Sequence, residues 1–307
     1  MKILVNTDSF GKINSAPRET LEKIGEIRYN QIGRKYSKEE LIEVLKDYNP
    51  DIIIAGTEKY DKEILNYCKK VKIISRVGIG LDSVDLLECE KNGIYVTNTP
   101  DAPSNAVAEL TMGHMLNLLR KIPEVGNDIK NHNWNRYIGR ELSESCVGII
   151  GYGRIGKKIS EKLDGFHSIW YVNDIEPSQL IGVSKEKIKE LEHILKNCDI
   201  ITLHIPLNEE NKNLISKTEF EIMKKNSIII NTSRGGIINE QDLYSWLKDN
   251  QSASAAIDVF EQEPYFGKLI ELSNCHLSPH LGSCTEKSRL DMEMGAVKNI
   301  KKFLEKK

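Results

Sequence analysis

Side chains that can carry out acid–base chemistry together follow three strand-like runs in the second half of the chain. Arg234 comes after the apolar run in "SIIINTS", Asp258, Glu261 and Glu263 come after "SAAI", and His280 comes after "CHLSP". A histidine exchanges a proton near neutral pH, and a carboxylate beside it orients the ring. An arginine holds a carboxylate through paired hydrogen bonds and polarises an adjacent carbonyl. Each residue alone would be ordinary surface or core, but at successive strand ends they suit oxidation of an alcohol or reduction of a ketone.

A glycine-rich segment, "CVGIIGYGRIGKKISEKL", predicts the hydride carrier that such a reaction needs. It has a strand-like run before its glycines and a helical run after them, as the dinucleotide-binding fingerprint requires. Gly151 would form the tight turn, Gly153 would let the backbone approach a pyrophosphate, and Gly156 would pack helix against strand. Asp174 ends the next strand-like run, where an acid binds the adenine ribose and repels a 2′-phosphate. The sequence therefore predicts NAD, whereas a glycine-rich turn that binds nothing would not need strand, helix and acid in register.

The elements that must position these residues are short apolar runs that alternate with amphipathic runs. This alternation predicts parallel sheets with helices on both faces, and runs that are apolar at nearly every position predict strands buried on both sides. Pro100 and Pro103 interrupt the pattern before a long helical run. We therefore predict an α/β protein with two doubly wound parallel-sheet domains. The first comprises residues 1–100 with 286–307, and the second, a Rossmann domain, comprises residues 101–285.

The composition narrows the class of protein further. A chain of 307 residues is too long to fold around one small hydrophobic core, which favours two domains. The net charge of −2 lacks the basic excess of a nucleic-acid surface, and no apolar run could cross a bilayer, so we expect no nucleic-acid or membrane partner. Six cysteines are scattered without paired spacing, and no histidine or cysteine cluster has ligand spacing. We therefore expect reduced thiols in a cytoplasmic protein that lacks a metal site and a signal peptide.

Seven segments, in order along the chain, resemble the D-isomer-specific 2-hydroxyacid dehydrogenases, above all the D-3-phosphoglycerate dehydrogenase branch. They are "SRVGIGLDSVD", "SNAVAELTMG", "GIIGYGRIGKKI", "DIITLHIPLNEENKNLI", "INTSRGGIINE", "AAIDVFEQEP" and "LSPHLGS". Because they span nearly the whole chain, they are more specific than the glycine motif alone. The resemblance implies a flavodoxin-like substrate domain and a Rossmann-like NAD-binding domain around a cleft, and homodimers joined through the NAD-binding domain. The chain stops at Lys307, which leaves no room for a C-terminal regulatory domain, so we expect none.

The resemblance also implies a role for individual residues. Arg234 matches the arginine that binds the substrate carboxylate, Glu263 the carboxylate paired with the catalytic histidine, and His280 the general acid/base. The positions that match cofactor-binding residues are Gly151, Gly153, Arg154, Ile155, Gly156, Asp174, His204, Pro206, Thr232, Ser233, Asp258 and Gly282. The positions that match substrate-binding residues, beside Arg234, are Arg76, Val77, Gly78 and Asn105.

One segment departs from the phosphoglycerate pattern. Relatives specific for phosphoglycerate often carry an Arg–Ser pair where this chain has Ala55 and Gly56, which weakens the case for a phosphorylated substrate. Lys59, Arg76 or Arg136 could supply the charge instead, or could be solvated surface. We expect hydride transfer between NAD(H) and C2 of a small D-2-hydroxy acid or 2-keto acid. Candidate substrates are 3-phosphoglycerate, glycerate, hydroxypyruvate, glyoxylate and sugar-derived acids. The second hypothesis is a binding protein that senses NAD(H). It is less favoured because Arg234, Glu263 and His280 are all present.

Overall fold

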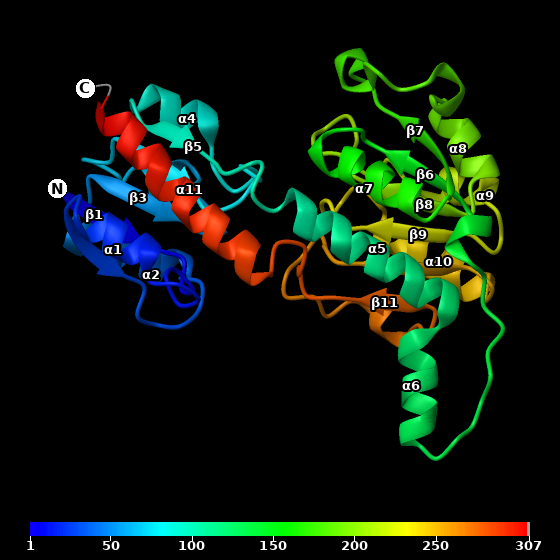
Figure 1. Ribbon diagram of the computed structural model, residues 1–307. Helices are drawn as coiled ribbons and strands as arrows, with labels where there is room; N and C mark the ends of the chain where they lie inside the picture. Colours follow the sequence, from blue (N-terminus) through cyan, green and yellow to red (C-terminus); the bar gives the residue numbers. More distant parts are fainter. Residues whose placement is uncertain (306–307) are drawn as a thin grey trace. The chain divides into compact units, whose positions relative to one another are not determined.

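The computed structural model describes residues 1–305 and divides into two compact units (Figure 1). Unit 1 is Met1–Pro103 together with the segment that starts at Ser283, and unit 2 is Ser104–Gly282. The predicted boundaries lay at residues 100/101 and 285/286, near these two crossings. Helix α5 (Ser104–Arg120) begins directly after Pro103, a residue type that favours extended backbone before it.

Unit 1 contains a five-stranded parallel sheet in the order β2-β1-β3-β4-β5. Its strands are β1 (Lys2–Val5), β2 (Glu26–Tyr29), β3 (Ile52–Ala55), β4 (Ile73–Arg76) and β5 (Tyr95–Thr97). Its helices are α1 (Ala16–Glu22), α2 (Lys38–Tyr48), α3 (Lys62–Leu65), α4 (Leu86–Lys91) and α11 (Glu286–Glu305). Alternate strand residues face opposite sides, so Leu4 and Ile53 pack under α2 and α3 whereas Ile3 and Ile52 pack under α1 and α11. The sheet is thus covered on both faces, as parallel sheets require.

Unit 2 contains a six-stranded parallel sheet in the order β11-β10-β9-β8-β6-β7. Its strands are β6 (Cys146–Ile150), β7 (Ile169–Asn173), β8 (Ile200–Leu203), β9 (Ile228–Asn231), β10 (Ser254–Ile257) and β11 (Cys275–Leu277). Its helices are α5, α6 (Ile122–Lys130), α7 (Arg154–Gly165), α8 (Leu191–Asn197), α9 (Lys217–Ile222) and α10 (Glu240–Asp249). The order reverses between β6 and β8, which is the switch point where such sheets bind ligands.

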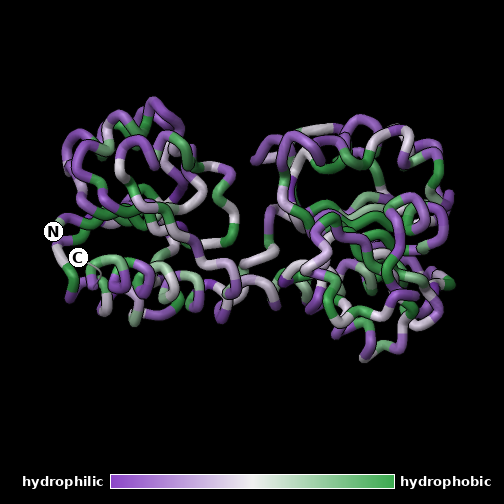
Figure 2. The backbone as a smooth tube through the Cα atoms, turned by 90° about the horizontal axis from the view of Figure 1, so that it is seen from above, coloured by the Kyte–Doolittle hydropathy of each residue, from purple (hydrophilic) through white to green (hydrophobic). Residues whose placement is uncertain are grey.

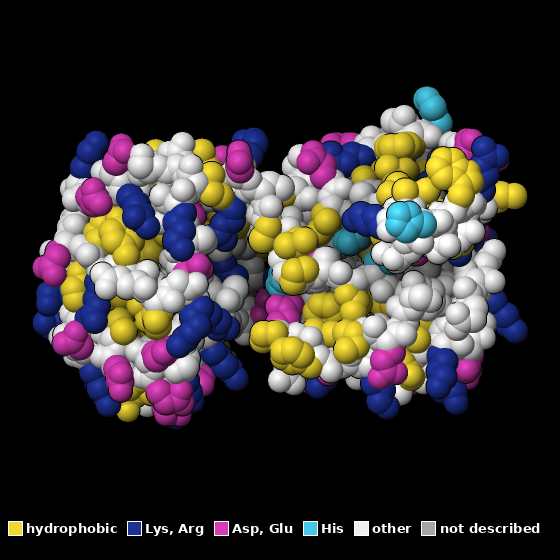
Figure 3. All heavy atoms as spheres, turned by 90° about the horizontal axis from the view of Figure 1, so that it is seen from below, with side chains coloured by type: hydrophobic (Ala, Val, Ile, Leu, Met, Phe, Trp, Pro, Cys, Tyr) yellow, Lys and Arg dark blue, Asp and Glu magenta, His cyan; other side chains and the backbone are white. Residues whose placement is uncertain are grey.

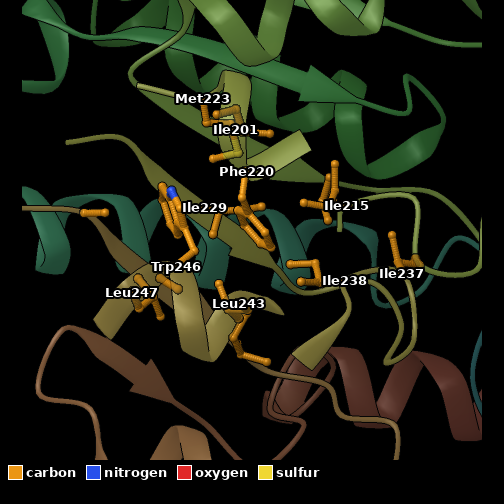
Figure 4. Packing of buried hydrophobic residues seen from close by; sticks show 14 of the residues in the cluster. Ile201, Ile215, Phe220, Met223, Ile229, Ile237, Ile238, Leu243, Trp246 and Leu247 are labelled. Carbon is orange, nitrogen blue, oxygen red and sulfur yellow. The ribbon is translucent and has the colours of Figure 1, made fainter. Parts of the chain in front are cut away.

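Two apolar layers hold the sheet of unit 2 between its helices. On one face Ile201 and Ile229 lie beneath α9 and α10, where Phe220 stacks on Trp246 with ring centroids 4.9 Å apart (Figure 4). On the other face Ile200 lies in a cluster with α5 and α7. Figure 2 shows the same arrangement, since hydrophobic strands run inside each unit and hydrophilic segments lie outside. Within the described residues, none of the helices combines the length and apolar character that a bilayer span requires.

Candidate active site

The predicted site residues of unit 2 follow neighbouring strands at one edge of its sheet. The strand register pairs Leu203 with Asn231, Asn231 with Ile257, and Ile257 with Leu277. These are the last residues of β8, β9, β10 and β11, so the polar residues that follow them start at the same level. The carboxyl edge of an open parallel sheet is where ligands bind. The local sequence therefore brings side chains from four separate stretches to one place.

The three glycines between β6 and α7 each meet a different steric demand. Gly151 has φ +93°, and a Cβ on it would lie 2.5 Å from the backbone oxygen of His204. A Cβ on Gly156 would lie 2.2 Å from the backbone oxygen of Gly151, so this glycine lets α7 pack on the turn. A Cβ on Gly153 would meet no atom within 4 Å, and α7 begins after it without a side-chain cap. The turn therefore presents an open helix N-terminus, which suits a pyrophosphate.

Asp174 follows β7 and lies next to the same turn. Its Oδ2 accepts a hydrogen bond of 2.6 Å from the backbone N–H of Tyr152, and its Oδ1 accepts one of 2.9 Å from that of Glu176. The carboxylate is thus fixed beside the glycines while the residue stays partly exposed. This is where an acid must lie to accept hydrogen bonds from a ribose bound along the turn. The residues present therefore fit a dinucleotide without a 2′-phosphate.

His280 and Glu263 form a hydrogen-bonded pair at the carboxyl edge of unit 2. Nδ1 of His280 lies 2.9 Å from Oε2 and 3.1 Å from Oε1 of Glu263. Both side chains are partly exposed, at 46% and 39% of their surface. The backbone of His280 has φ +54°, an uncommon value for a residue with a side chain, and its N–H donates to the backbone oxygen of Asp258 at 2.9 Å. A carboxylate that holds one ring nitrogen leaves the histidine oriented for proton transfer through the other.

The loop that carries Arg234 is shaped by a side chain at the end of β9. Oδ1 of Asn231 accepts hydrogen bonds from the N–H and Oγ of Ser233, and its Nδ2 donates to the backbone oxygen of Arg234 at 2.8 Å. Nη1 of Arg234 donates to the backbone oxygen of Ser233 at 2.6 Å. A Cβ on Gly235 would overlap the backbone of Phe260, so this glycine lets the loop after β9 lie against the loop after β10. The guanidinium is therefore held at the edge that carries the His280–Glu263 pair.

Comparison with known proteins identifies the protein family that has this arrangement. Residues 112–282, more than half of the chain, match the family model described as "D-isomer specific 2-hydroxyacid dehydrogenase, NAD binding domain". The chain belongs to this dehydrogenase family. The resemblance carried by the seven sequence segments, the two-sheet fold and NAD as the cofactor are thereby confirmed.

Several relatives resemble the chain over most of its length. The D-3-phosphoglycerate dehydrogenase of Methanocaldococcus jannaschii is 37% identical over 289 residues, which are 92% of this chain and 54% of that protein. The glyoxylate reductase of Thermococcus litoralis is 34% identical over 295 residues, 92% of this chain and 88% of that protein. The NAD⁺-bound 3-phosphoglycerate dehydrogenase of Entamoeba histolytica has a TM-score of 0.83 at 31% identity, and covers 99% of this chain and 95% of that one. The chain spans about half the length of the curated D-3-phosphoglycerate dehydrogenases it matches.

Asp258, which the sequence assigned to the cofactor, organises the loop that carries His280. Its side chain is fully buried. Oδ1 accepts hydrogen bonds from the backbone N–H of Leu281 at 2.7 Å and from Oγ of Ser278 at 2.6 Å, and Oδ2 accepts one from the N–H of Gly282 at 2.9 Å. A buried carboxylate needs such partners, because an unsatisfied one would be costly. Within the protein, Asp258 thus fixes the residues on both sides of His280.

The other predicted cofactor residues lie along the same edge. Nε2 of His204 lies 2.7 Å from Oγ1 of Thr202, and burial holds the pKa of His204 well below its ordinary value, so it is neutral at neutral pH. Oγ1 of Thr232 lies 3.0 Å from Oγ1 of Thr111, which ties the end of β9 to α5. A Cβ on Gly282 would lie 3.2 Å from the side chain of Val107 in the same helix. The remaining ones are Ser233, which is buried in the loop before Arg234, and Arg154, Ile155 and Pro206, which are exposed or partly exposed.

The predicted substrate residues fall into two groups in different units. Arg76 ends β4, and the two residues after it, Val77 and Gly78, are buried at the carboxyl edge of unit 1. The backbone oxygen of Gly78 accepts a hydrogen bond from the N–H of Thr99, and the N–H of Gly78 donates to Oγ1 of Thr99. Asn105 instead begins α5 of unit 2 and is exposed, with its side chain bonded to Glu109 and Lys162. Of the three candidate cations, Lys59 and Arg76 lie in unit 1 and Arg136 lies in unit 2. Lys59 and Arg136 are exposed, and Arg76 is partly exposed. The described residues contain no cluster that could hold a metal ion.

Sequence reasoning missed residues that act through their contacts rather than through a strand-end position. Asn231 shapes the Arg234 loop, and the only indication was its place before "TSRGG". His114 lies in the middle of α5, where Nε2 is 3.5 Å from Oγ of Ser278, and burial lowers its pKa. Nothing in the spacing of an apolar helix distinguishes such a histidine from a core residue. These contacts link α5 to the loop of His280.

Proposed function

We propose that this dehydrogenase transfers a hydride between NAD(H) and C2 of a small D-2-hydroxy acid or 2-keto acid, with His280, Glu263 and Arg234 as its catalytic residues. The observation that carries the proposal is the 2.9 Å contact between His280 and Glu263 at the edge that also holds the glycine turn and Arg234. A proton must move whenever a hydride joins or leaves an alcohol carbon, and this pair can move it. An arginine at the same edge can bind the acid group that defines the substrate class.

In the reductive direction, bound NADH supplies the hydride that C2 of the keto acid accepts. Protonated His280 donates its proton to the carbonyl oxygen, while Glu263 stabilises the imidazolium. Arg234 binds the carboxylate and polarises the adjacent carbonyl. Asp174 binds the adenine ribose. The N-terminus of α7, together with Arg154 and Ile155, contacts the pyrophosphate. The remaining cofactor contacts in this proposal are Gly151, Gly153, Gly156, His204, Pro206, Thr232, Ser233, Asp258 and Gly282.

We further propose that unit 1, together with Asn105, supplies substrate contacts through Arg76, Val77 and Gly78. Relatives named D-3-phosphoglycerate dehydrogenase and relatives named glyoxylate reductase are almost equally similar to the chain, so similarity alone does not choose between a phosphorylated and an unphosphorylated acid. The replacement of the Arg–Ser pair by Ala55 and Gly56 favours an unphosphorylated acid such as glyoxylate, hydroxypyruvate or a sugar-derived acid.

The experiment is a panel of phosphorylated and unphosphorylated 2-keto acids with NADH, followed by loss of absorbance at the wavelength of reduced nicotinamide. We expect turnover with at least one acid, and we expect His280→Ala to lower it by orders of magnitude while NADH still binds. Tight NADH binding without oxidation by any acid would support the NAD(H)-sensing protein instead. Near-normal turnover of His280→Ala would remove the histidine from the mechanism.

We also propose a homodimer formed through unit 2. Helix α6 projects from the unit (Figure 1), and this helix and the segment after it expose Ile122, Ile129, Trp134, Tyr137 and Ile138. Figure 3, which views the molecule from below, shows hydrophobic side chains at the surface of unit 2. Exposed apolar groups in such number are typical of an interface. Light scattering should give the mass of two chains, and Trp134→Asp with Ile138→Asp should give the mass of one.

A cytoplasmic location is part of the same proposal. Four of the six cysteines are buried as thiols, at positions 68, 89, 198 and 275, which suits a reducing compartment. Cell fractionation with a membrane marker and a secreted marker as references would test the location.

A further inference from the structure

The sheet of unit 1 has its own ligand-binding position. In the strand order β2-β1-β3-β4-β5 the chain switches direction between β1 and β3, and ligands of such sheets bind outside the carboxyl ends of these two strands. The register pairs Val5 with Ile54, so Asn6 after β1 and Gly56 after β3 leave the sheet side by side. The N–H of Asn6 donates to the backbone oxygen of Ile54 at 2.9 Å.

A buried carboxylate occupies this position. Glu58 is only 3% exposed, and its Oε2 accepts a hydrogen bond of 2.9 Å from the backbone N–H of Gly56. The side chain folds back so closely that a Cβ on Gly56 would lie 2.9 Å from the same oxygen. Burial raises the pKa of Glu58, whereas the positive charges of Lys35 and Arg76 act in the opposite direction. Glu58 therefore places a negative charge within reach of the positive charge of Arg76, the last residue of β4.

A second buried acceptor lies beside this strand end. Asn6 is fully buried, and its Nδ2 donates to the hydroxyl of Tyr60, which is fully buried as well. Among the residues that the structure describes, none forms a hydrogen bond with Oδ1 of Asn6. Because this oxygen is itself buried, it does not contact a ligand directly, but its partial negative charge adds to that of the Glu58 carboxylate near the same strand end. A phosphate dianion offers acceptors and negative charge, the opposite of what these two side chains require.

We propose that Glu58 is a specificity-determining residue that disfavours phosphorylated substrates and favours 2-keto acids whose distal group is uncharged or donates a hydrogen bond. The inference rests on the proposed function, in which residues of unit 1 supply substrate contacts. A phosphate bound at this edge either is repelled by the carboxylate or forces it to take up a proton, and both lower affinity. Glu58 also offsets the charges of Arg76 and Lys35, which would otherwise attract a phosphate.

Glu58→Gln tests the proposal, because glutamine keeps an oxygen that can accept from Gly56 and removes the charge. Glu63→Gln is the matched control: it removes a carboxylate from α3 of the same unit, where the side chain is 61% exposed. The kcat/KM values for phosphohydroxypyruvate and hydroxypyruvate with NADH give a ratio for each protein. We expect Glu58→Gln to raise the ratio of phosphorylated to unphosphorylated substrate at least about tenfold, which corresponds to about 1.4 kcal/mol. We expect Glu63→Gln to leave it unchanged.

A second readout separates this inference from the proposed function. Calorimetry with NADH present, which cannot react with a hydroxy acid, measures the affinity for 3-phosphoglycerate and for D-glycerate without turnover. The same tenfold gain for the phosphorylated ligand is expected in Glu58→Gln, even in a protein that oxidises no NADH. An unchanged ratio in both readouts, in a variant that unfolds at the wild-type temperature, would show that Glu58 only holds its loop. Loss of turnover with every acid in the wild type would instead overturn the proposed function.

Discussion

The role of Glu263 can be tested by removing its charge while keeping its shape. At 2.9 Å, Coulomb's law gives about 1.4 kcal/mol between the carboxylate and a protonated His280 in water, and about 6 kcal/mol at an effective dielectric constant of 20. Because the two side chains are 46% and 39% exposed, solvent screens the pair and the lower part of this range applies. A loss of about 2–3 kcal/mol of transition-state stabilisation corresponds to a fall of about 30- to 150-fold in turnover.

The assay is the steady-state oxidation of NADH by the preferred keto acid, with kcat and KM measured for Glu263→Gln. Glu261→Gln is the control, since it removes an exposed carboxylate two positions away that follows the same strand. The midpoint of thermal unfolding should shift by less than about 3 °C, because partly exposed ion pairs contribute at most about 1 kcal/mol to stability. If Glu263→Gln kept more than half of the wild-type kcat, or if Glu261→Gln lost as much, the assigned pair would be wrong.

Three further predictions concern stability and cofactor affinity. Asp258→Asn should lower the free energy of unfolding in urea by about 2–4 kcal/mol, because an amide cannot accept all the hydrogen bonds that this buried carboxylate accepts. Gly156→Ala should weaken NADH binding, measured by nicotinamide fluorescence, at least about tenfold, since the added Cβ would lie 2.2 Å from a backbone oxygen of the glycine turn. Burial raises the pKa of Glu293, so its carboxyl favours the folded state below its unfolded pKa of about 4.5 and this contribution is lost as the pH rises through the folded pKa. Urea midpoints measured from pH 4 to pH 8 should therefore fall more steeply with rising pH in the wild type than in Glu293→Gln, and parallel curves would contradict the assignment.

Most of the fold could be predicted from periodicity because the central strands are apolar at nearly every position. Strands such as "DIIIAG" and "SIIIN" have this pattern because helices cover both of their faces. The edge strand β2 does not: it consists of Glu26–Tyr29, pairs only with β1, and has only partly buried or exposed residues. An alternation rule cannot find a strand that buries so little. Helix α6 was likewise hidden, because α5 ends at Arg120 and Lys121 turns the chain with φ +50°.

The candidate site could be predicted as far as strand ends define it. The sequence placed Asp258, Glu261 and Glu263 after one strand and left the partner of the histidine open until family resemblance selected Glu263. The structure shows Glu263 in contact with His280, and Asp258 fully buried beneath the same loop. Sequence spacing could not distinguish these carboxylates, because the distinction depends on how the loops after β10 and β11 fold over each other. The burial of Glu58 could not be predicted either, because it depends on how the loop after β3 folds. The sequence does not distinguish Glu58 from the next residue, Lys59, which is exposed.

The backbone of His280 gives a last prediction about how the catalytic loop is held. A φ of +54° is costly for any residue with a Cβ, by about 1–2 kcal/mol, and glycine avoids this cost while it loses about 0.5–1 kcal/mol through its greater freedom when unfolded. The free energy of unfolding of His280→Gly should therefore exceed that of His280→Ala by about 0.5–1 kcal/mol, and we expect both variants to be inactive. At exposed Glu161 in helix α7 the order should reverse, with the alanine variant more stable by about 1 kcal/mol.

Urea unfolding of the four variants measures both differences. Equal stability of the two His280 variants would mean that the loop relaxes and that no strain is held at this position. The predicted order would mean that the hydrogen bonds to Asp258 hold His280 in a conformation that it would not adopt alone. The orientation of the proton donor would then depend on a buried carboxylate that contacts the loop on both sides of the histidine.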